Sequence, residues 1–145
     1  MKVDIKKVFS KSDERAEIHV VTVTEEIQSA VDLLENNRRS IPVINTEETV
    51  MCPLDKVYYI ESVDKRTFVY TKNKCFETRY RLYELEGLLS YEFFRCSKSM
   101  IINVKKIASV KAEFNARLRA FLLNGEEVII SRNYVKDLKG KLGLM

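Results

Sequence analysis

Apolar and polar residues alternate in two short stretches near the start of the chain. The first is centred on Val3 and Ile5, and the second covers residues 18–21. Alternation with a period of two places side chains on opposite faces of an extended backbone, so it is typical of strands. Both stretches are therefore expected to form strands.

The pattern changes to a helical one after Thr24. Thr24 followed by Glu25 and Glu26 resembles an N-cap with acidic residues in the first turn, where the helix dipole favours them, and 36–37 is a plausible stop. We expect a strand–strand–helix unit over residues 1–48, too small to stand alone, which is a candidate dimerisation layer. The helix carries one apolar stripe at i, i+3, i+4, i+7, formed by Ile27, Ala30, Val31 and Leu34.

Short apolar runs separated by polar turns follow from residue 41 onward. Leucine spacing predicts one short helix that ends near Ser90, and Tyr134 to Leu138 predicts a closing helical turn. Asn124-Gly125 between two apolar runs predicts a two-residue type I′ hairpin. The expected fold is mainly β (α+β), with antiparallel sheets and short helices over residues 49–145. The predicted strands cover residues 41–44, 57–60, 67–71, 75–78, 93–96, 100–102, 107–114, 118–123 and 128–130.

Charge is distributed unevenly along the chain. The net charge is +4, but residues 1–50 carry 7 Lys/Arg against 10 Asp/Glu, and residues 51–145 carry 18 against 11. A basic body of net charge +7 suggests a polyanionic partner. A lysine-rich surface that serves only solubility explains the same numbers, so charge alone does not decide the function.

The sequence lacks the usual parts of an enzyme. His19 is the only histidine, the three cysteines are irregularly spaced and expected to be reduced, and no phosphate-binding glycine motif occurs. We therefore expect no catalytic residues, no metal, no cofactor and no small-molecule substrate. The N-terminus has no apolar segment of the signal-peptide type, so a cytoplasmic location is expected.

Four segments resemble the LytTR-type DNA-binding domain of bacterial response regulators, in order and at family-like spacing. They are Val57-Tyr58-Tyr59-Ile60-Glu61-Ser62, then Arg81-Leu82-Tyr83-Glu84-Leu85-Glu86, then the most recognisable run Phe93-Phe94-Arg95-Cys96-Ser97-Lys98-Ser99-Met100-Ile101-Ile102-Asn103, and finally Ile130-Ser131-Arg132-Asn133-Tyr134 after Asn124-Gly125. The resemblance covers about residues 50–143.

This resemblance implies an antiparallel β fold that inserts loop side chains into successive major grooves of double-stranded DNA. Three segments carry the family's contacts, and many members have histidine where this chain has Ser97-Lys98. The implied DNA-binding residues are Lys65, Arg66 and Thr67 in the first segment, Ser97 and Lys98 in the second, and Arg132 and Asn133 in the third.

Side-chain chemistry agrees with these positions. Arginine offers a bidentate fork to guanine, which suits Arg66 and Arg132, and lysine suits phosphate, as at Lys65, Lys98 and residues 105–106. Arg95 is expected to pair with an acid such as Glu61 or Glu92. The aromatic residues alternate as core residues of strands do.

The sequence favours a stand-alone LytTR family transcriptional regulator that acts as a homodimer. The first 50 residues are too few for a receiver domain, and small members of the family are often paired with a membrane-bound regulatory protein. An alternative is a protein-interaction module that keeps the fold without reading DNA. RNA binding is disfavoured because the aromatic residues do not form a stacking platform.

Overall fold

The computed structural model describes residues 1–35, 40–89 and 92–144. The chain divides into an N-terminal unit, Met1–Glu35, and a C-terminal unit, Asn36–Met145. The predicted stop at 36–37 and the expected helix end at Ser90 lie outside the described residues. No helix in the described part of the chain is both long and apolar enough to cross a membrane.

The N-terminal unit contains a 3-10 turn, η1 (Lys11–Asp13), and one α-helix, α1 (Glu25–Glu35). The helix begins as predicted, because the Thr24 hydroxyl accepts a hydrogen bond from the Ile27 backbone N–H at 3.3 Å. The two strands expected before it are wrong, since residues 1–24 contain no strand. Alternating side chains make a strand only when another backbone satisfies its N–H and C=O groups, and none does so here.

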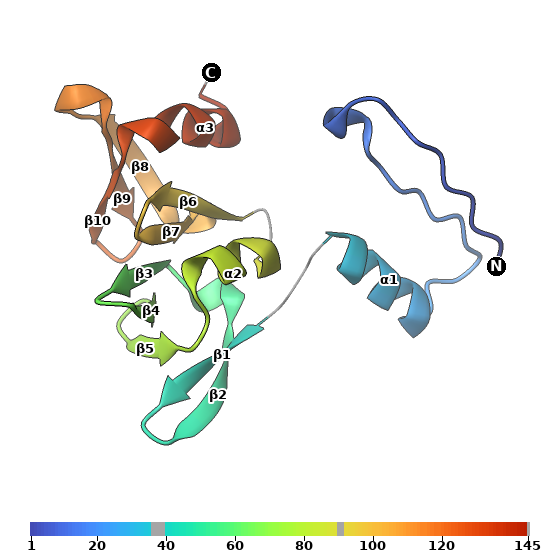
Figure 1. Cartoon of the computed structure of the whole chain (residues 1–145), viewed down its shortest axis with the longest axis horizontal. Helices are drawn as coiled ribbons and strands as arrows, with labels where there is room; N and C mark the ends of the chain where they lie inside the picture. The colour runs from blue at the N-terminus through green and yellow to red at the C-terminus, as the bar shows by residue number, and fades with distance from the viewer. Residues whose placement is uncertain (36–39, 90–91, 145) are drawn as a thin grey trace. The chain divides into compact units, whose positions relative to one another are not determined.

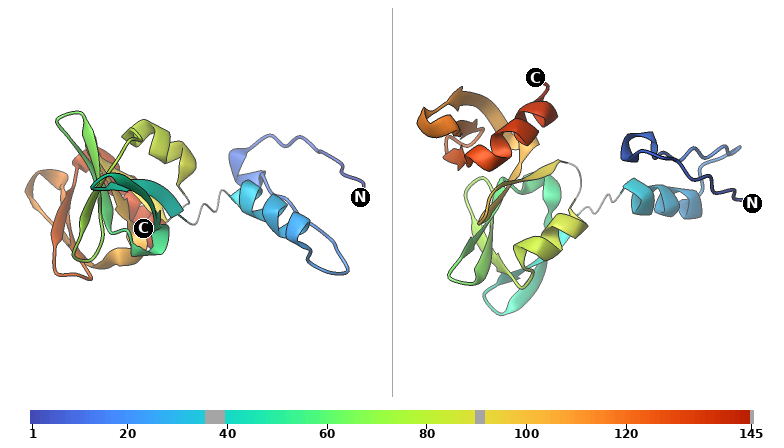
Figure 2. Two further views of the ribbon diagram at one scale, coloured as in Figure 1. Left: turned by 90° about the horizontal axis from the view of Figure 1, so that it is seen from below. Right: turned by 45° about the horizontal axis from the view of Figure 1, so that its top comes forward.

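The C-terminal unit is an antiparallel β structure with short helices, as the sequence predicts (Figures 1 and 2). One sheet has seven strands in the order β2-β1-β5-β4-β3-β7-β6, and a second has three in the order β10-β9-β8. The strands are β1 (Ser40–Asn45), β2 (Glu48–Pro53), β3 (Tyr59–Val63), β4 (Arg66–Tyr70), β5 (Cys75–Thr78), β6 (Phe93–Ser97), β7 (Met100–Asn103), β8 (Ile107–Ala112), β9 (Leu118–Leu122) and β10 (Glu127–Ile130). The other elements are α2 (Leu82–Leu88), α3 (Arg132–Leu142), η2 (Leu54–Lys56), η3 (Val104–Lys106) and η4 (Phe114–Ala116).

Two apolar clusters form the core of the C-terminal unit. Ile101 belongs to the cluster that also holds residues of α2, whereas its neighbour Ile102 belongs to the cluster that holds β8–β10 residues and Leu138 of α3. Successive strand residues point to opposite faces, so β7 is covered on both sides. Both figures show α3 beside β6 and the three-stranded sheet, and α2 beside β3 and β6.

Hairpin turns differ from the prediction in an instructive way. The β9–β10 hairpin forms, but only Gly125 has positive φ (89°), and its N–H donates to the Leu122 carbonyl at 3.0 Å. This is a three-residue loop that ends on a left-handed glycine, so the type I′ assignment was wrong. Two consecutive positive φ values occur instead in the β3–β4 turn, at Asp64 (50°) and Lys65 (66°), and between β8 and β9, at Asn115 (63°) and Ala116 (60°).

Candidate nucleic-acid interface

Two backbone hydrogen bonds bring the three predicted contact segments to one edge of the C-terminal unit. The Ser62 N–H, at the end of β3, donates to the Ser99 carbonyl in the β6–β7 turn at 2.8 Å. The Ser131 N–H, just before α3, donates to the Cys96 carbonyl of β6 at 2.9 Å. The β6–β7 turn therefore lies between the β3–β4 turn and the start of α3.

The first segment is a tight turn that projects beyond the sheet. Lys65 is exposed, and its backbone carbonyl accepts a hydrogen bond from Arg81 Nη1 at 2.9 Å. Arg81 itself starts α2, where its N–H donates to Glu84 Oε1 at 3.0 Å. The two central residues of this turn are in the left-handed region, which costs a non-glycine residue about 1 kcal/mol or more. The hydrogen bond from Arg81, at the start of α2, supports the turn in this conformation.

The exposed Arg66 side chain forms an ion pair within the protein. Its Nε and Nη2 donate to the two carboxylate oxygens of Glu77 at 2.7 and 2.9 Å, and its guanidinium lies 5.2 Å from the centre of the Phe68 ring. The hydrogen bonds and charge of Arg66 lower the pKa of the Glu77 carboxyl. The same fork that would bind guanine is therefore occupied by a carboxylate, and Arg66 has to leave Glu77 before it can contact a base.

Thr67 does not belong to the exposed surface. It lies in β4, opposite Thr78 of β5, and it is only 3 % exposed. Its position at the base of the β3–β4 turn makes it part of the sheet interior. Thr67 is therefore not accessible to a ligand in this structure, contrary to the expectation from the sequence.

The second segment is held in place by Arg95. Its Nε donates to the Ser97 carbonyl at 2.8 Å, its Nη2 donates to the Lys98 carbonyl, and its Nη1 pairs with Glu86 Oε1 at 2.7 Å. The Ser97 hydroxyl accepts the Ser99 N–H at 3.2 Å, which leaves the exposed Lys98 side chain at the tip.

Arg95 is thus a positioning residue. The acid that it pairs with is Glu86, not Glu61 or Glu92 as expected from the sequence. Glu92 instead pairs with Lys105 at 2.7 Å, which reduces the case for Lys105 as a phosphate contact. Neither pairing is visible in sequence spacing, because each joins residues from different elements.

The third segment is a helix start and not a loop. Arg132 and Asn133 are the first two residues of α3, and both are exposed. Within the described residues, Arg132 makes no hydrogen bond or ion pair through its side chain. The first N–H groups of a helix lack intrahelical partners and favour anions, so this position combines a free arginine fork with a backbone suited to phosphate.

Sequence reasoning missed Arg79. The register pairs Thr67 with Thr78, so continuing it by one residue sets Arg79 opposite Arg66 at the end of these two strands that carries the β3–β4 turn. Arg79 is exposed. The register between β4 and β5 is the signal that identifies it, and register follows from turn geometry that composition does not reveal.

Comparison with known proteins identifies the family. Residues 47–143 match the family model described as the LytTr DNA-binding domain. The C-terminal unit also resembles the solved LytTr DNA-binding domain of a Bacillus cereus protein described as a methyl-accepting/DNA response regulator. The TM-score is 0.69 at 30 % identity, over 74 % of this chain and 99 % of that one. The chain belongs to the LytTR family, and residues 47–143 form its DNA-binding domain.

Relatives of similar length come from Staphylococcus aureus. An uncharacterized HTH-type transcriptional regulator of strain bovine RF122 / ET3-1 is 26 % identical over 146 residues, and one of strain NCTC 8325 / PS 47 is 28 % identical over 147 residues. Each match covers 99 % of both chains. The described C-terminal unit of this chain does not fit the term HTH, because five strands separate α2 from α3.

Proposed function

We propose that this protein is a transcriptional regulator that binds specific sequences in double-stranded DNA through the edge formed by the β3–β4 turn, the β6–β7 turn and the start of α3. The observation that carries the proposal is the pair of backbone hydrogen bonds that joins these segments, Ser62 to Ser99 and Cys96 to Ser131. The family and the names of the S. aureus relatives support the same function.

The exposed side chains at this edge divide into two roles. Arg132 reads a guanine through its fork, and Asn133 beside it suits adenine. Lys65 and Lys98, at the tips of the two turns, contact phosphates and set the position of the protein on the duplex. Ser97 acts through its hydroxyl, which shapes the turn that carries Lys98.

Insertion into successive major grooves is the proposed docking geometry. The two turns are narrow hairpin ends. Val63 pairs with Arg66, so Asp64 and Lys65 lie two residue levels beyond Ser62, roughly 7 Å at a strand rise of about 3.3 Å per residue. This reach is comparable to the depth of the major groove, about 8.5 Å. Arg66 joins the contact when phosphate or base acceptors replace Glu77.

The remaining parts of the proposal concern assembly and place in the cell. The protein acts as a cytoplasmic, non-enzymatic homodimer that uses the N-terminal unit as its dimerisation layer. A membrane-bound regulatory protein is a further proposed partner. The apolar stripe of α1 supports dimerisation, because none of its residues is buried and an uncovered apolar face needs a partner surface.

The first test is selection of binding sites from random duplexes at several salt concentrations, with the wild type, Arg132→Ala and Arg15→Ala. Arg15 of the N-terminal unit is the matched control, because its removal changes the net charge equally. We expect a defined motif, a loss of roughly 1–3 kcal/mol on that motif for Arg132→Ala, and no loss for Arg15→Ala.

Two results contradict this proposal. If no motif is enriched and binding disappears near physiological salt, the edge is only a basic surface, and a protein-interaction module on the same fold becomes the better explanation. If both arginine variants lose affinity equally, the effect is one of net charge and Arg132 reads no base.

A further inference from the structure

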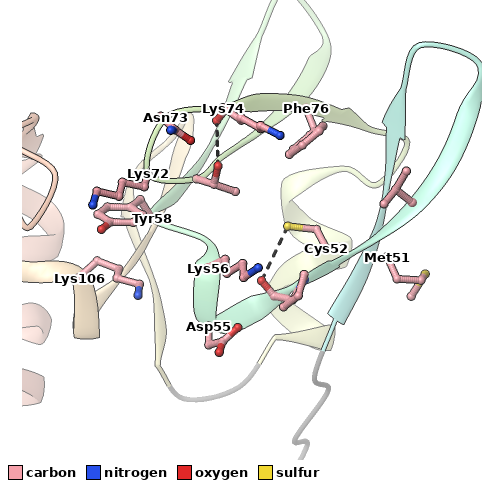
Figure 3. A pocket seen from close by; sticks show the side chains of 13 residues that line it. Met51, Cys52, Asp55, Lys56, Tyr58, Lys72, Asn73, Lys74, Phe76 and Lys106 are labelled. Atoms are coloured by element: carbon pink, nitrogen blue, oxygen red, sulfur yellow. Dashed lines mark hydrogen bonds between the residues drawn. The ribbon is translucent and has the colours of Figure 1, made fainter.

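A second candidate binding region lies in the C-terminal unit, away from the three contact segments. It is a cleft of about 530 Å³ between strand β2, the η2 turn and the β4–β5 turn (Figure 3). Clefts that hold small molecules have volumes of roughly 300–1,000 Å³, with mostly apolar walls and a few polar groups. The size of this cleft falls inside that range.

The walls of the cleft are largely apolar. Val50 of β2 is 37 % exposed and Phe76 of β5 is partly buried, and both line the cleft; Met51, the next residue of β2, lines it as well and is 54 % exposed. Cys52 lies deeper, with its thiol directed to the Pro53 carbonyl at 3.7 Å, and burial raises the pKa of this thiol. The cleft therefore has an apolar surface that is exposed to solvent when no ligand is bound.

Positive charge surrounds this apolar surface. Four lysines line the cleft, and Asp55 is the one acidic residue among its lining side chains. Within the described part of the chain, none of the four ammonium groups forms an ion pair with a carboxylate. The four residues are Lys56, Lys72, Lys74 and Lys106.

The lysines are attached to ordered backbone. The Thr71 N–H donates to the Lys74 carbonyl at 2.9 Å and closes the β4–β5 turn. Asn124, from the β9–β10 loop, donates to the Lys72 carbonyl at 3.3 Å. Lys106 lies over the Tyr58 ring, 5.2 Å from its centre. Because this backbone is held by hydrogen bonds, the lysines stay beside the cleft and can attract an anion without a rearrangement of the chain.

This cleft is remote from the proposed DNA-binding edge. It adjoins Tyr58 and Thr71, whereas the DNA-binding edge adjoins the β3–β4 turn at the other end of the same two strands. Each strand has five residues, which at about 3.3 Å per residue separates the two ends by roughly 16 Å. A small molecule in the cleft does not occupy the DNA site.

We infer that this cleft binds a small amphiphilic anion, with a carboxylate or phosphate head held by the lysines and a short apolar tail against Val50 and Phe76. A duplex uses cations but gains nothing from the apolar wall, and a neutral apolar molecule leaves the ammonium groups unmatched. Only a ligand with both features satisfies both parts of the cleft.

The test uses the full chain without DNA, so its failure is separate from failure of the proposed function. Decanoate and decyl phosphate are the probes, with decanol as the tail without charge, and acetate and inorganic phosphate as the heads without tail. Binding is measured by calorimetry, and its place by amide chemical-shift changes. We expect the two amphiphiles to bind at least roughly tenfold more tightly than the controls, with shifts at Met51 and Phe76. Comparison of the two amphiphiles shows which head is preferred.

A charge-reversed variant locates the head group. Lys72 and Lys74 have exposed side chains, so the double variant Lys72→Glu/Lys74→Glu is expected to fold normally and to bind decanoate roughly tenfold less tightly. Lys111→Glu, on β8 and outside the cleft, is the control and is expected to bind as the wild type does.

Three outcomes overturn the inference. Equal binding of decanol and decanoate means that only apolar contact operates, and shifts outside the cleft mean that the site is elsewhere. If the double variant binds decanoate as tightly as the wild type does, these lysines do not hold the head group.

Discussion

The N-terminal unit and the C-terminal unit have similar apolar patterns but use them differently. In the N-terminal unit no residue is buried, and Leu33 and Leu34 of α1 are 82 % and 65 % exposed. In the C-terminal unit, strands and helices with comparable patterns bury their apolar residues in two clusters. The difference lies in partners, because each strand of the C-terminal unit has a neighbouring strand and each helix a sheet to cover.

This comparison teaches that a periodic pattern defines a face but not what covers it. The stripe of α1 is as regular as that of α3, yet only α3 contributes a fully buried leucine, Leu138. An apolar face that the chain itself leaves uncovered is suited to contact with another surface. The first two predictions that follow test this contrast, and the third tests an ion pair within the C-terminal unit.

The largest expected effect compares two leucine truncations. Leu138→Ala removes a side chain that is 0 % exposed, so the free energy of unfolding should fall by roughly 2–5 kcal/mol. Leu33→Ala, off the apolar stripe of α1, should change it by no more than about 0.5 kcal/mol. Denaturant unfolding followed by circular dichroism measures both. Equal losses would show that α1 is packed as tightly as α3.

The next effect concerns assembly through α1. Val31→Asp places a charge in the apolar stripe, so a dimer held by this face should weaken by roughly 1–3 kcal/mol and dissociate on dilution. Ser29→Asp adds the same charge on the opposite side of the helix and should leave the dimer intact. Light scattering gives the molar mass of each. A folded Val31→Asp protein with unchanged mass would contradict dimerisation through α1.

The smallest effect is a pH dependence from the Arg66–Glu77 pair. Because Arg66 lowers the pKa of Glu77 in the folded state, the pair stabilises the protein above the ordinary glutamate pKa of about 4.3, and this contribution disappears as the pH falls through the lowered value. The free energies of unfolding of the wild type and of the Glu77→Gln variant should therefore differ at pH 7 and become equal in acid.

Added salt should reduce the Glu77→Gln difference at pH 7, because both side chains are partly exposed. Arg66→Gln and the double variant complete a cycle in which the two losses should not add. Additive losses would mean that the two residues act independently of each other.

The sequence predicts most of the fold of the C-terminal unit because its signals are local. The hairpin around Lys72 to Lys74 and the leucine-spaced helix both form near their expected positions. The strands predicted near Val3 and residues 18–21 fail because pairing is not local. The predicted closing turn is an 11-residue helix that extends beyond residues 134–138 on both sides and ends at Gly143, which has a left-handed conformation.

The sequence predicts where the candidate interface lies, but not whether each of its side chains is exposed and unpaired. The resemblance gives Lys65, Lys98 and Arg132, and the structure places all three near one edge. The resemblance does not reveal that Arg66 is paired with Glu77 or that Thr67 is buried, because both facts depend on the register of β4 with β5. Residues that are distant in sequence decide whether a candidate side chain is available.

The bonds that join the three contact segments run from backbone to backbone, from Ser62 to Ser99 and from Ser131 to Cys96. Exposed side chains on these segments can change without loss of either bond. An evolving regulator can therefore exchange the residues that read bases while the spacing between its readers stays constant. On the proposed function, the same property makes this edge a scaffold on which a new target sequence is selected by varying Arg132 and Asn133.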